Sequence, residues 1–261
     1  MEVNLDPINI FDFDGTLTTE TWPKFWVWAK KYGYSGERRN EALEKALAKY
    51  RSIHEGDMLE TFFGFFNDLL VSNHDTLSQA ELMEGERYIK YNPGVESFIR
   101  KTNLRNYIVS GGLKEFLEGL AIAPFFCGIY GTPVIKDSNG LITGIGEVMT
   151  DDKKIQSIQD ILKRNNRIGN DCHNVFYIGD GYSDAPAMRF VHENGGKAVF
   201  VYQPIQNDEL YEQIKETYKA LKNEGILDYA FVADYSDDSS LLDVLQRPRT
   251  KLISSDGPYI E

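Results

Sequence analysis

Two aspartates separated by one residue are the strongest candidates for chemistry in this sequence of 261 residues. Asp12 and Asp14 end an apolar run, and Gly15 behind them allows a sharp turn. Because side chains alternate along an extended strand, the two carboxylates would point the same way and repel each other. Such a pair suits a nucleophile beside a general acid and base. The alternative is an acidic turn at a strand end that does no chemistry.

A second acidic pair lies much later in the chain, within Gly179 to Asp184. Asp180 and Asp184 follow another apolar run, and Pro186 is typical of the first turn of a helix. Beside the first pair, these carboxylates would complete a cluster of hard oxygen ligands, which suits Mg²⁺. Taken alone, Asp184 is equally well explained as a helix N-cap.

A serine followed by two glycines is a weaker candidate. Ser110, Gly111 and Gly112 come directly after the apolar run Tyr107 to Val109, so we expect a turn at a strand end. A small hydroxyl with exposed backbone N–H groups can bind a phosphate. Most turns of this composition bind nothing.

Two lysines open a helix whose apolar positions include Ile158 and Ile161. Cations at a helix start oppose the helix dipole, so Lys153 and Lys154 carry a small local cost. One of them could neutralise the carboxylates and a phosphate. The alternative is an ordinary solvent-exposed lysine.

These candidates need a scaffold that brings them together, and the pattern of elements predicts one. Short β-rich runs alternate with helical patterns, which is typical of an α/β fold with a Rossmann-like, doubly wound parallel sheet. Three of the runs end in Asp, Ser or Gly, at the strand ends where open parallel sheets bind ligands. The expected strands are Ile8–Phe13, Tyr107–Val109, Val175–Ile178, Ala198–Tyr202 and Tyr229–Val232.

Residues 18–90 depart from this alternation and carry apolar residues at helical spacing. We therefore predict a catalytic core made of residues 1–17 and 91–261, with residues 18–90 inserted as a helical cap. The predicted cap helices are Trp22–Tyr32, Glu37–Tyr50, Met58–Val71 and Ser78–Tyr91. The cap is rich in aromatic residues, which we expect mainly to form its own core, with a substrate wall or a dimer face as alternatives.

A hairpin is predicted over residues 129–149. Its turn would be Asp137 to Gly140, between two β-rich runs. A further surface helix is expected over Asp208 to Asn223, with no function assigned to it.

In order and spacing, the four candidates resemble the motifs of the haloacid-dehalogenase-like hydrolase superfamily. The cap between the first two motifs, and the return at Tyr91 to Val95, resemble its phosphoserine-phosphatase-like branch. The resemblance implies that Asp12 attacks phosphorus and becomes an aspartyl-phosphate. It implies that Asp14 protonates the leaving alcohol and then activates water.

The same resemblance implies a Mg²⁺ cofactor and a set of ligands for it. The metal would bind the Asp12 carboxylate, the Asp14 backbone carbonyl and Asp180, while Asp184 would hold a metal-bound water or the lysine. Lys154 is preferred to Lys153, because the family places apolar residues four and seven positions after its lysine. The phosphoryl oxygens would be bound by Ser110, Gly111 and Lys154.

The substrate is less well specified than the reaction. Asp14 favours hydrolysis of a small phosphorylated metabolite, because dehalogenases and transport ATPases of the superfamily lack an acid at this place. Phosphoserine phosphatases carry a substrate-binding Glu nine residues after the nucleophile; here Thr21 stands there, with Glu20 one position earlier. Phosphoserine phosphatase, phosphotransferase or phosphomutase, and a non-catalytic phospho-ligand-binding protein remain alternatives.

Composition limits the classes of binding partner and the cellular compartment that we expect. The net charge of −12 argues against nucleic acid and against an anionic membrane surface. Two cysteines far apart favour a reducing compartment. With no signal-peptide pattern and no apolar run of about 20 residues, we expect a soluble, cytoplasmic protein. Nothing in the sequence indicates an oligomeric state.

Overall fold

A six-stranded sheet forms the centre of the molecule in the computed structural model, which describes residues 6–19, 31–32, 41–53 and 58–246. The strand order is β3-β2-β1-β6-β7-β8, and every neighbouring pair is parallel. This confirms the predicted α/β fold. The strands are β1 (Ile8–Phe11), β2 (Arg105–Leu113), β3 (Gly128–Thr132), β6 (Val175–Gly179), β7 (Lys197–Tyr202) and β8 (Tyr229–Val232).

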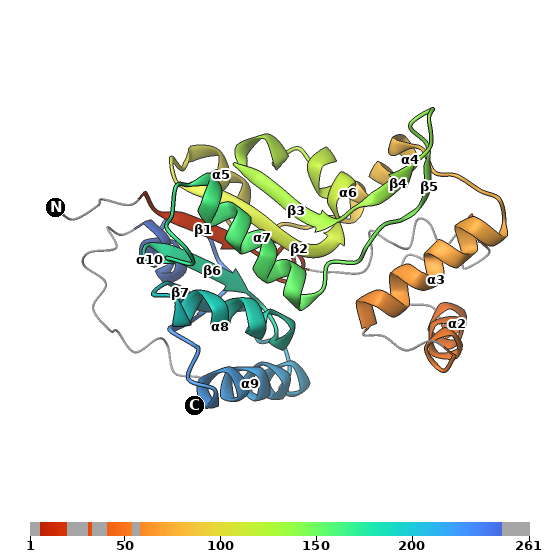
Figure 1. Ribbon diagram of the computed structural model, residues 1–261. Coiled ribbons are helices and arrows are strands. Elements are labelled where there is room, and N and C mark those ends of the chain that lie inside the picture. Colours follow the sequence, from red (N-terminus) through yellow and green to blue (C-terminus); the bar gives the residue numbers. More distant parts are fainter. Residues whose placement is uncertain (1–5, 20–30, 33–40, 54–57, 247–261) are drawn as a thin grey trace.

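Helices cover both faces of this sheet, which makes it doubly wound (Figure 1). One face packs against α5 (Val95–Lys101), α6 (Lys114–Gly119) and α10 (Ser240–Gln246). The other packs against α7 (Asp151–Arg164), α8 (Ala185–Glu193) and α9 (Asp208–Asn223), the last matching the predicted surface helix. The central strands read as continuous apolar runs because both of their faces are buried.

The cap region joins the core through two segments that run side by side. Thr18 and Tyr91 form an antiparallel bridge, and the Thr19 N–H donates to the Lys90 carbonyl at 2.8 Å. Between them lie α2 (Glu41–Arg51), α3 (Met58–Ser72), α4 (Gln79–Met83) and the 3₁₀ helix η2 (Glu84–Tyr88). The division into core and cap stays a prediction.

Two of the predicted cap helices differ from the expectation in separate ways. One lies largely outside the described residues, and the other is shorter than predicted. Of the predicted helix Trp22–Tyr32, the structure describes only its last two residues. The predicted helix Ser78–Tyr91 is an α-helix for only five residues, after a capping box between Ser78 and Glu81. It then tightens into the 3₁₀ helix, where Gly85 is a poor α-helix former.

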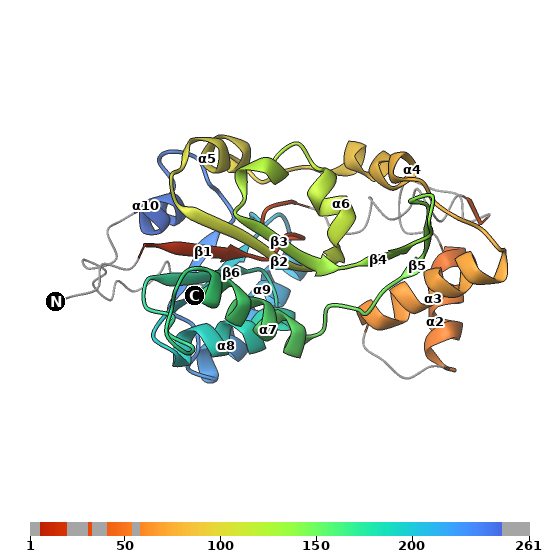
Figure 2. The same cartoon turned by 45° about the horizontal axis from the view of Figure 1, so that its top comes forward.

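The predicted hairpin is present but shorter, because Pro133 divides its first strand. Pro133 has no N–H to continue the ladder, so Gly128–Thr132 becomes the edge strand β3 of the main sheet. The hairpin itself consists of β4 (Val134–Lys136) and β5 (Ile142–Ile145). Figure 2 shows it extending from the sheet towards α3 and α4.

The described aromatic residues of α3 are buried, but they share an apolar cluster with the sheet and α5 and do not form a separate core of the predicted cap. Phe63 and Leu70 of this helix lie in the same apolar cluster as Phe98 of α5 and Phe11 of β1. The buried phenylalanines of α3 are Phe62, Phe63, Phe65 and Phe66. The tryptophans of the cap lie outside the described residues. No helix in the described ranges is long and apolar enough to span a bilayer.

Two glycines with positive φ allow a matched test of the close backbone contact at which the chain returns from the cap to the core. Gly94 (φ 76°) starts α5, and a Cβ there would lie 2.3 Å from backbone atoms of Tyr235 and Ser236. Gly140 (φ 80°) lies in the hairpin turn, and a Cβ there would meet nothing within 4 Å.

We expect Gly94→Ala to lose about 1–3 kcal/mol more free energy of unfolding than Gly140→Ala in urea titrations. Both variants carry the left-handed backbone cost of about 1–2 kcal/mol, and only the first adds a backbone clash. Equal losses of unfolding free energy in the two variants would show that Gly94 and Tyr235 are not in close contact.

Candidate active site

The ends of two neighbouring central strands bring the acidic residues together. The Asp12 N–H donates to the Ile178 carbonyl at 2.9 Å, so the pairing of β1 with β6 extends one residue beyond β1. Asp180 follows β6 directly. Carboxylate oxygens of Asp12, Asp180 and Asp184 all lie within 4.8 Å of one another. Asp12 and Asp184 are buried.

The tight turn after Asp14 depends on a residue without a side chain. Gly15 has φ 75°, and a Cβ there would lie 1.8 Å from Oδ2 of Asp180. A left-handed backbone at this point would also strain any other residue. The glycine therefore lets the two acidic loops approach each other.

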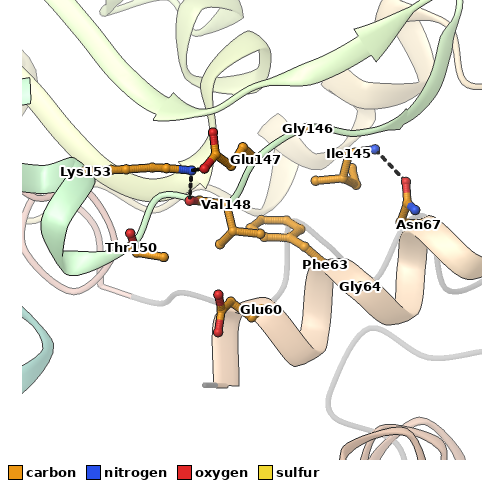
Figure 3. Close-up of a pocket in the computed structure, with 10 residues that line it drawn as sticks. All are labelled: Glu60, Phe63, Gly64, Asn67, Ile145, Gly146, Glu147, Val148, Thr150 and Lys153. Carbon is orange, nitrogen blue, oxygen red and sulfur yellow. Dashed lines mark hydrogen bonds and ion pairs between the residues drawn. The ribbon is translucent and has the colours of Figure 1, made fainter. Parts of the chain in front are cut away.

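Lys154 provides a cation inside this cluster. From the first turns of α7, its Nζ lies 2.8 Å from Oδ1 of Asp184 and 3.7 Å from Oδ1 of Asp12. Lys153 points elsewhere: its Nζ lies 2.6 Å from Oε1 of Glu147 and donates to the Val148 carbonyl at 3.0 Å (Figure 3). The structure therefore places Lys154, not Lys153, beside the carboxylates.

Tyr177 is a contributor that sequence reasoning missed. It is fully buried, and its hydroxyl donates to Oδ1 of Asp184 at 2.8 Å. The signal available in the sequence was a hydroxyl-bearing residue inside the otherwise apolar strand β6. Among the residues that the structure describes, none hydrogen-bonds to Oδ2 of Asp184, although that oxygen is buried.

Ser110 lies inside a strand and not at its end, which corrects the expected turn. β2 continues to Leu113 with a shift of register after Val109. The Gly112 N–H donates to Oγ of Ser110 at 3.1 Å, so the serine can donate its own hydroxyl proton elsewhere. Two glycines permit this bulge without ending the strand.

Asp14 lies on the Ser110 side of the site. A Cβ on Gly112 would lie 3.7 Å from Oδ2 of Asp14 and 3.5 Å from Oγ of Ser110. Asp14 is partly exposed, and its carboxylate is not one of the three in the clustered group. The two carboxylates of the first motif therefore differ in exposure, since Asp12 is buried and Asp14 is partly exposed.

Burial and repulsion shift the charges of this group strongly. Burial and the neighbouring Asp184 raise the pKa of Asp12 to about 8 from its ordinary value of 3.8. Burial, with Asp12 and Asp184 close by, raises the pKa of Asp180 well above its usual range. Burial alone would lower the pKa of Lys154, but the carboxylates of Asp184 and Asp12 raise it overall. One lysine does not compensate three carboxylates.

The residues present suit a hard divalent cation. Three carboxylates converge, their excess charge is only partly compensated, and Oδ2 of Asp184 is buried without a described partner. Mg²⁺ prefers such oxygen donors together with water and phosphate oxygens. Asp12 and Asp180 are the side chains whose raised pKa values a bound cation would lower.

Side-chain amides of two distant residues hydrogen-bond to backbone carbonyls in the loop that carries Asp14. Nε2 of Gln203 donates to the Gly15 carbonyl at 2.9 Å, and Nδ2 of Asn92 donates to the Thr16 carbonyl at 2.8 Å. Sequence reasoning missed both residues. Gln203 follows the end of β7 and Asn92 lies at the return from the cap, which were the only signals available.

The end of α9 supports the second acidic loop. The Tyr182 hydroxyl, between Asp180 and Asp184 in sequence, donates to Glu224, and Arg189 of α8 donates to the same carboxylate. The helix without an assigned function thus contacts the loop that carries Asp180. Glu20 and Thr21, the predicted specificity residues, lie outside the described residues.

Comparisons with known proteins agree with this arrangement. A model of the haloacid dehalogenase-like hydrolase family matches residues 10–189, a range that includes Asp12, Ser110, Lys154 and Asp184. A comparison with curated protein sequences finds no match.

Solved structures share the fold at low sequence identity. A phosphoserine phosphatase with a phospho-aspartyl intermediate analogue is 17% identical at TM-score 0.57, covering 93% of this chain and 99% of that one. A protein of unknown function from Bordetella pertussis is 13% identical at TM-score 0.59, covering 89% and 100%.

A third structure is longer than this chain. A HAD family hydrolase from Salmonella enterica serovar Typhi is 21% identical at TM-score 0.54, and the match covers 77% of this chain. This chain spans only 65% of that hydrolase's length. Since the family model covers well over half of the sequence and spans all four motifs, the chain belongs to the haloacid dehalogenase-like hydrolase family.

Proposed function

We propose that this protein is a Mg²⁺-dependent phosphatase that hydrolyses a small phosphomonoester through an aspartyl-phosphate on Asp12. The observation that carries the proposal is the convergence of Asp12, Asp180 and Asp184, with Lys154 paired to the buried Asp12 and Asp184. Together with a bound Mg²⁺, such a group would neutralise charge and hold reacting atoms in place, which are the main requirements of phosphoryl transfer.

In this proposal Asp12 is the nucleophile, and Asp14 is first the general acid and then the general base. An oxygen of Asp12 bonds to phosphorus while the bond from phosphorus to the leaving oxygen breaks, and Asp14 gives that oxygen its proton. Asp14 then takes a proton from water, which attacks the phosphorus, releases phosphate and restores the Asp12 carboxylate. The partly exposed position of Asp14, near Ser110, supports this division.

Phosphoryl oxygens would be bound by Lys154, the Ser110 hydroxyl and the Gly111 N–H. Lys154 is already held between Asp12 and Asp184, and Ser110 keeps its hydroxyl proton for an acceptor. Asp12, Asp180 and the Asp14 carbonyl would hold Mg²⁺, with Asp184 acting through water. When bound, the ion would neutralise negative charge on the carboxylates and the phosphoryl group.

The cap would determine the substrate in this proposal, with residues 1–17 and 91–261 as the catalytic core. Phosphoserine is the first specific candidate, because several similar structures are phosphoserine phosphatases. Glu20 or Thr21 would then contact the substrate amine. A cytoplasmic setting is also part of the proposal, since Cys127 and Cys172 are both free.

The direct test is phosphate release from acetyl phosphate and p-nitrophenyl phosphate, with Mg²⁺ or EDTA, by the wild type and Asp12→Asn. We expect release to need the ion and to fall more than about a thousandfold in the variant, because a carboxamide cannot replace the carboxylate that attacks phosphorus. Wild-type rates in Asp12→Asn would disprove the proposal. Faster transfer to an added alcohol than to water would instead identify a phosphotransferase.

The two adjacent lysines give a matched pair of variants. Lys154→Met should lower kcat/KM for the better substrate about 100- to 1,000-fold, because a preorganised cation at the phosphoryl group is lost. Lys153→Met should stay within a few-fold of wild type, since that side chain binds Glu147. Steady-state kinetics of both proteins decide the matter, and equal losses would contradict the assigned role of Lys154.

A further inference from the structure

A leucine of the cap lies directly over the candidate phosphate-binding residues. Leu59 is in the first turn of α3, and a Cβ placed on Gly111 would lie 2.6 Å from its Cδ2. The next two nearest atoms, at 3.6 and 3.7 Å, also belong to Leu59. This contact therefore joins the cap to the residue that follows Ser110.

The backbone does not require a glycine at position 111, and the nearest neighbour of a side chain there would be the end of Leu59. Gly111 is not among the glycines with positive φ, so an L-residue could adopt its conformation. What an alanine there would meet is the Leu59 side chain. The space above Gly111 is thus occupied by Leu59.

The helix that carries Leu59 is fixed farther along its length. Oδ1 of Asn67 accepts a hydrogen bond from the Ile145 N–H at 2.9 Å, and Leu77, which lies beyond the end of the helix, forms an antiparallel bridge with Ile142 of the hairpin. Phe63 of the same helix is fully buried. Leu59 is therefore presented by a helix whose position the hairpin sets.

A cleft lies between α3 and the segment that leads into α7, and Glu60, the residue after Leu59, lines it (Figure 3). Its volume is about 340 Å³, and its lining includes Glu60, Phe63, Val148 and Thr150. Leu59 does not line this cleft, although the next residue does. The volume falls within the range of small-ligand sites, so it could hold part of a larger leaving group.

We propose that Leu59 determines the substrate range: its side chain fills the space above Gly111 and restricts the enzyme to phosphate compounds with small leaving groups. This inference rests on the proposed phosphatase activity. Shortening Leu59 to alanine removes the side-chain atoms that lie nearest to Gly111 and so enlarges the space above that residue. Larger aryl esters then gain access, while small substrates lose only an apolar contact.

The first experiment compares the ratio of kcat/KM for p-nitrophenyl phosphate to kcat/KM for acetyl phosphate. We expect Leu59→Ala to raise this ratio at least about tenfold, as changes of a few carbon atoms in apolar pockets do. Leu69→Ala is the matched control, because Leu69 is a partly buried leucine of the same helix. A ratio compared between variants is insensitive to the fraction of active protein.

The second experiment is a double-mutant cycle between Leu59 and Gly111. Gly111→Ala keeps the backbone N–H but adds a methyl group against Leu59, so kcat/KM should fall for both substrates. Adding Leu59→Ala to that variant should restore most of the loss, which is the non-additivity expected of residues in contact. Additive losses would overturn the proposal.

The outcomes separate this inference from the function on which it rests. If the wild type hydrolyses neither compound in an Asp12-dependent way, the phosphatase proposal fails, and the role of Leu59 fails with it. If the wild type is active but the substrate ratio is the same in wild type, Leu59→Ala and Leu69→Ala, only the role of Leu59 is wrong.

Discussion

Repulsion between buried carboxylates is the constraint on which this site depends. Asp12 and Asp180 follow adjacent parallel strands whose register pairs Phe11 with Ile178, so the fold itself forces them together. The consequence is visible in the pKa of Asp12, which burial and Asp184 raise to about 8. Such an arrangement is stable only if protons or cations offset the charge. Lys154 supplies one positive charge, and the proposed metal would supply the rest.

Much of the surrounding structure serves to keep the acidic loops close. Gly15 removes the side chain that would collide with Asp180, and Tyr177 holds Asp184 from within the sheet. Gln203 fixes the first loop from the end of β7, while Glu224 at the end of α9 holds the second. These contacts come from separate parts of the chain. Together they hold the acidic residues close to one another despite their mutual repulsion.

The sequence predicts the sheet and the acidic cluster well because both have local signals. Apolar runs that are buried on both faces identify the strands, and parallel strands place their carboxyl ends at one edge. The choice of Lys154 over Lys153 also agrees with the side-chain positions in the structure. The chemical role of the carboxylates that meet at this edge is not given by these local signals. It rests on the family resemblance and on the proposed function.

Other features could not be predicted because their determinants are distant in sequence. Gln203 and Asn92 bind loop carbonyls 188 and 76 residues away, and no local pattern reports such partners. Ser110 was expected at a strand end, but pairing with β3 continues β2 past it. The edge strand β3 was assigned to the hairpin, since the effect of Pro133 becomes clear only when the main sheet is seen.

The most direct test of the account is the number of protons released when Mg²⁺ binds. Calorimetric titration of the metal-free protein at pH 7, in two buffers of different ionisation enthalpy, measures that number. Burial and the neighbouring Asp184 raise the pKa of Asp12 to about 8, so we expect binding of the ion at this pH to displace a proton from the carboxylate cluster. The account predicts release of about one proton or more per ion. Binding heats that are identical in both buffers would show that no proton is released and would contradict it.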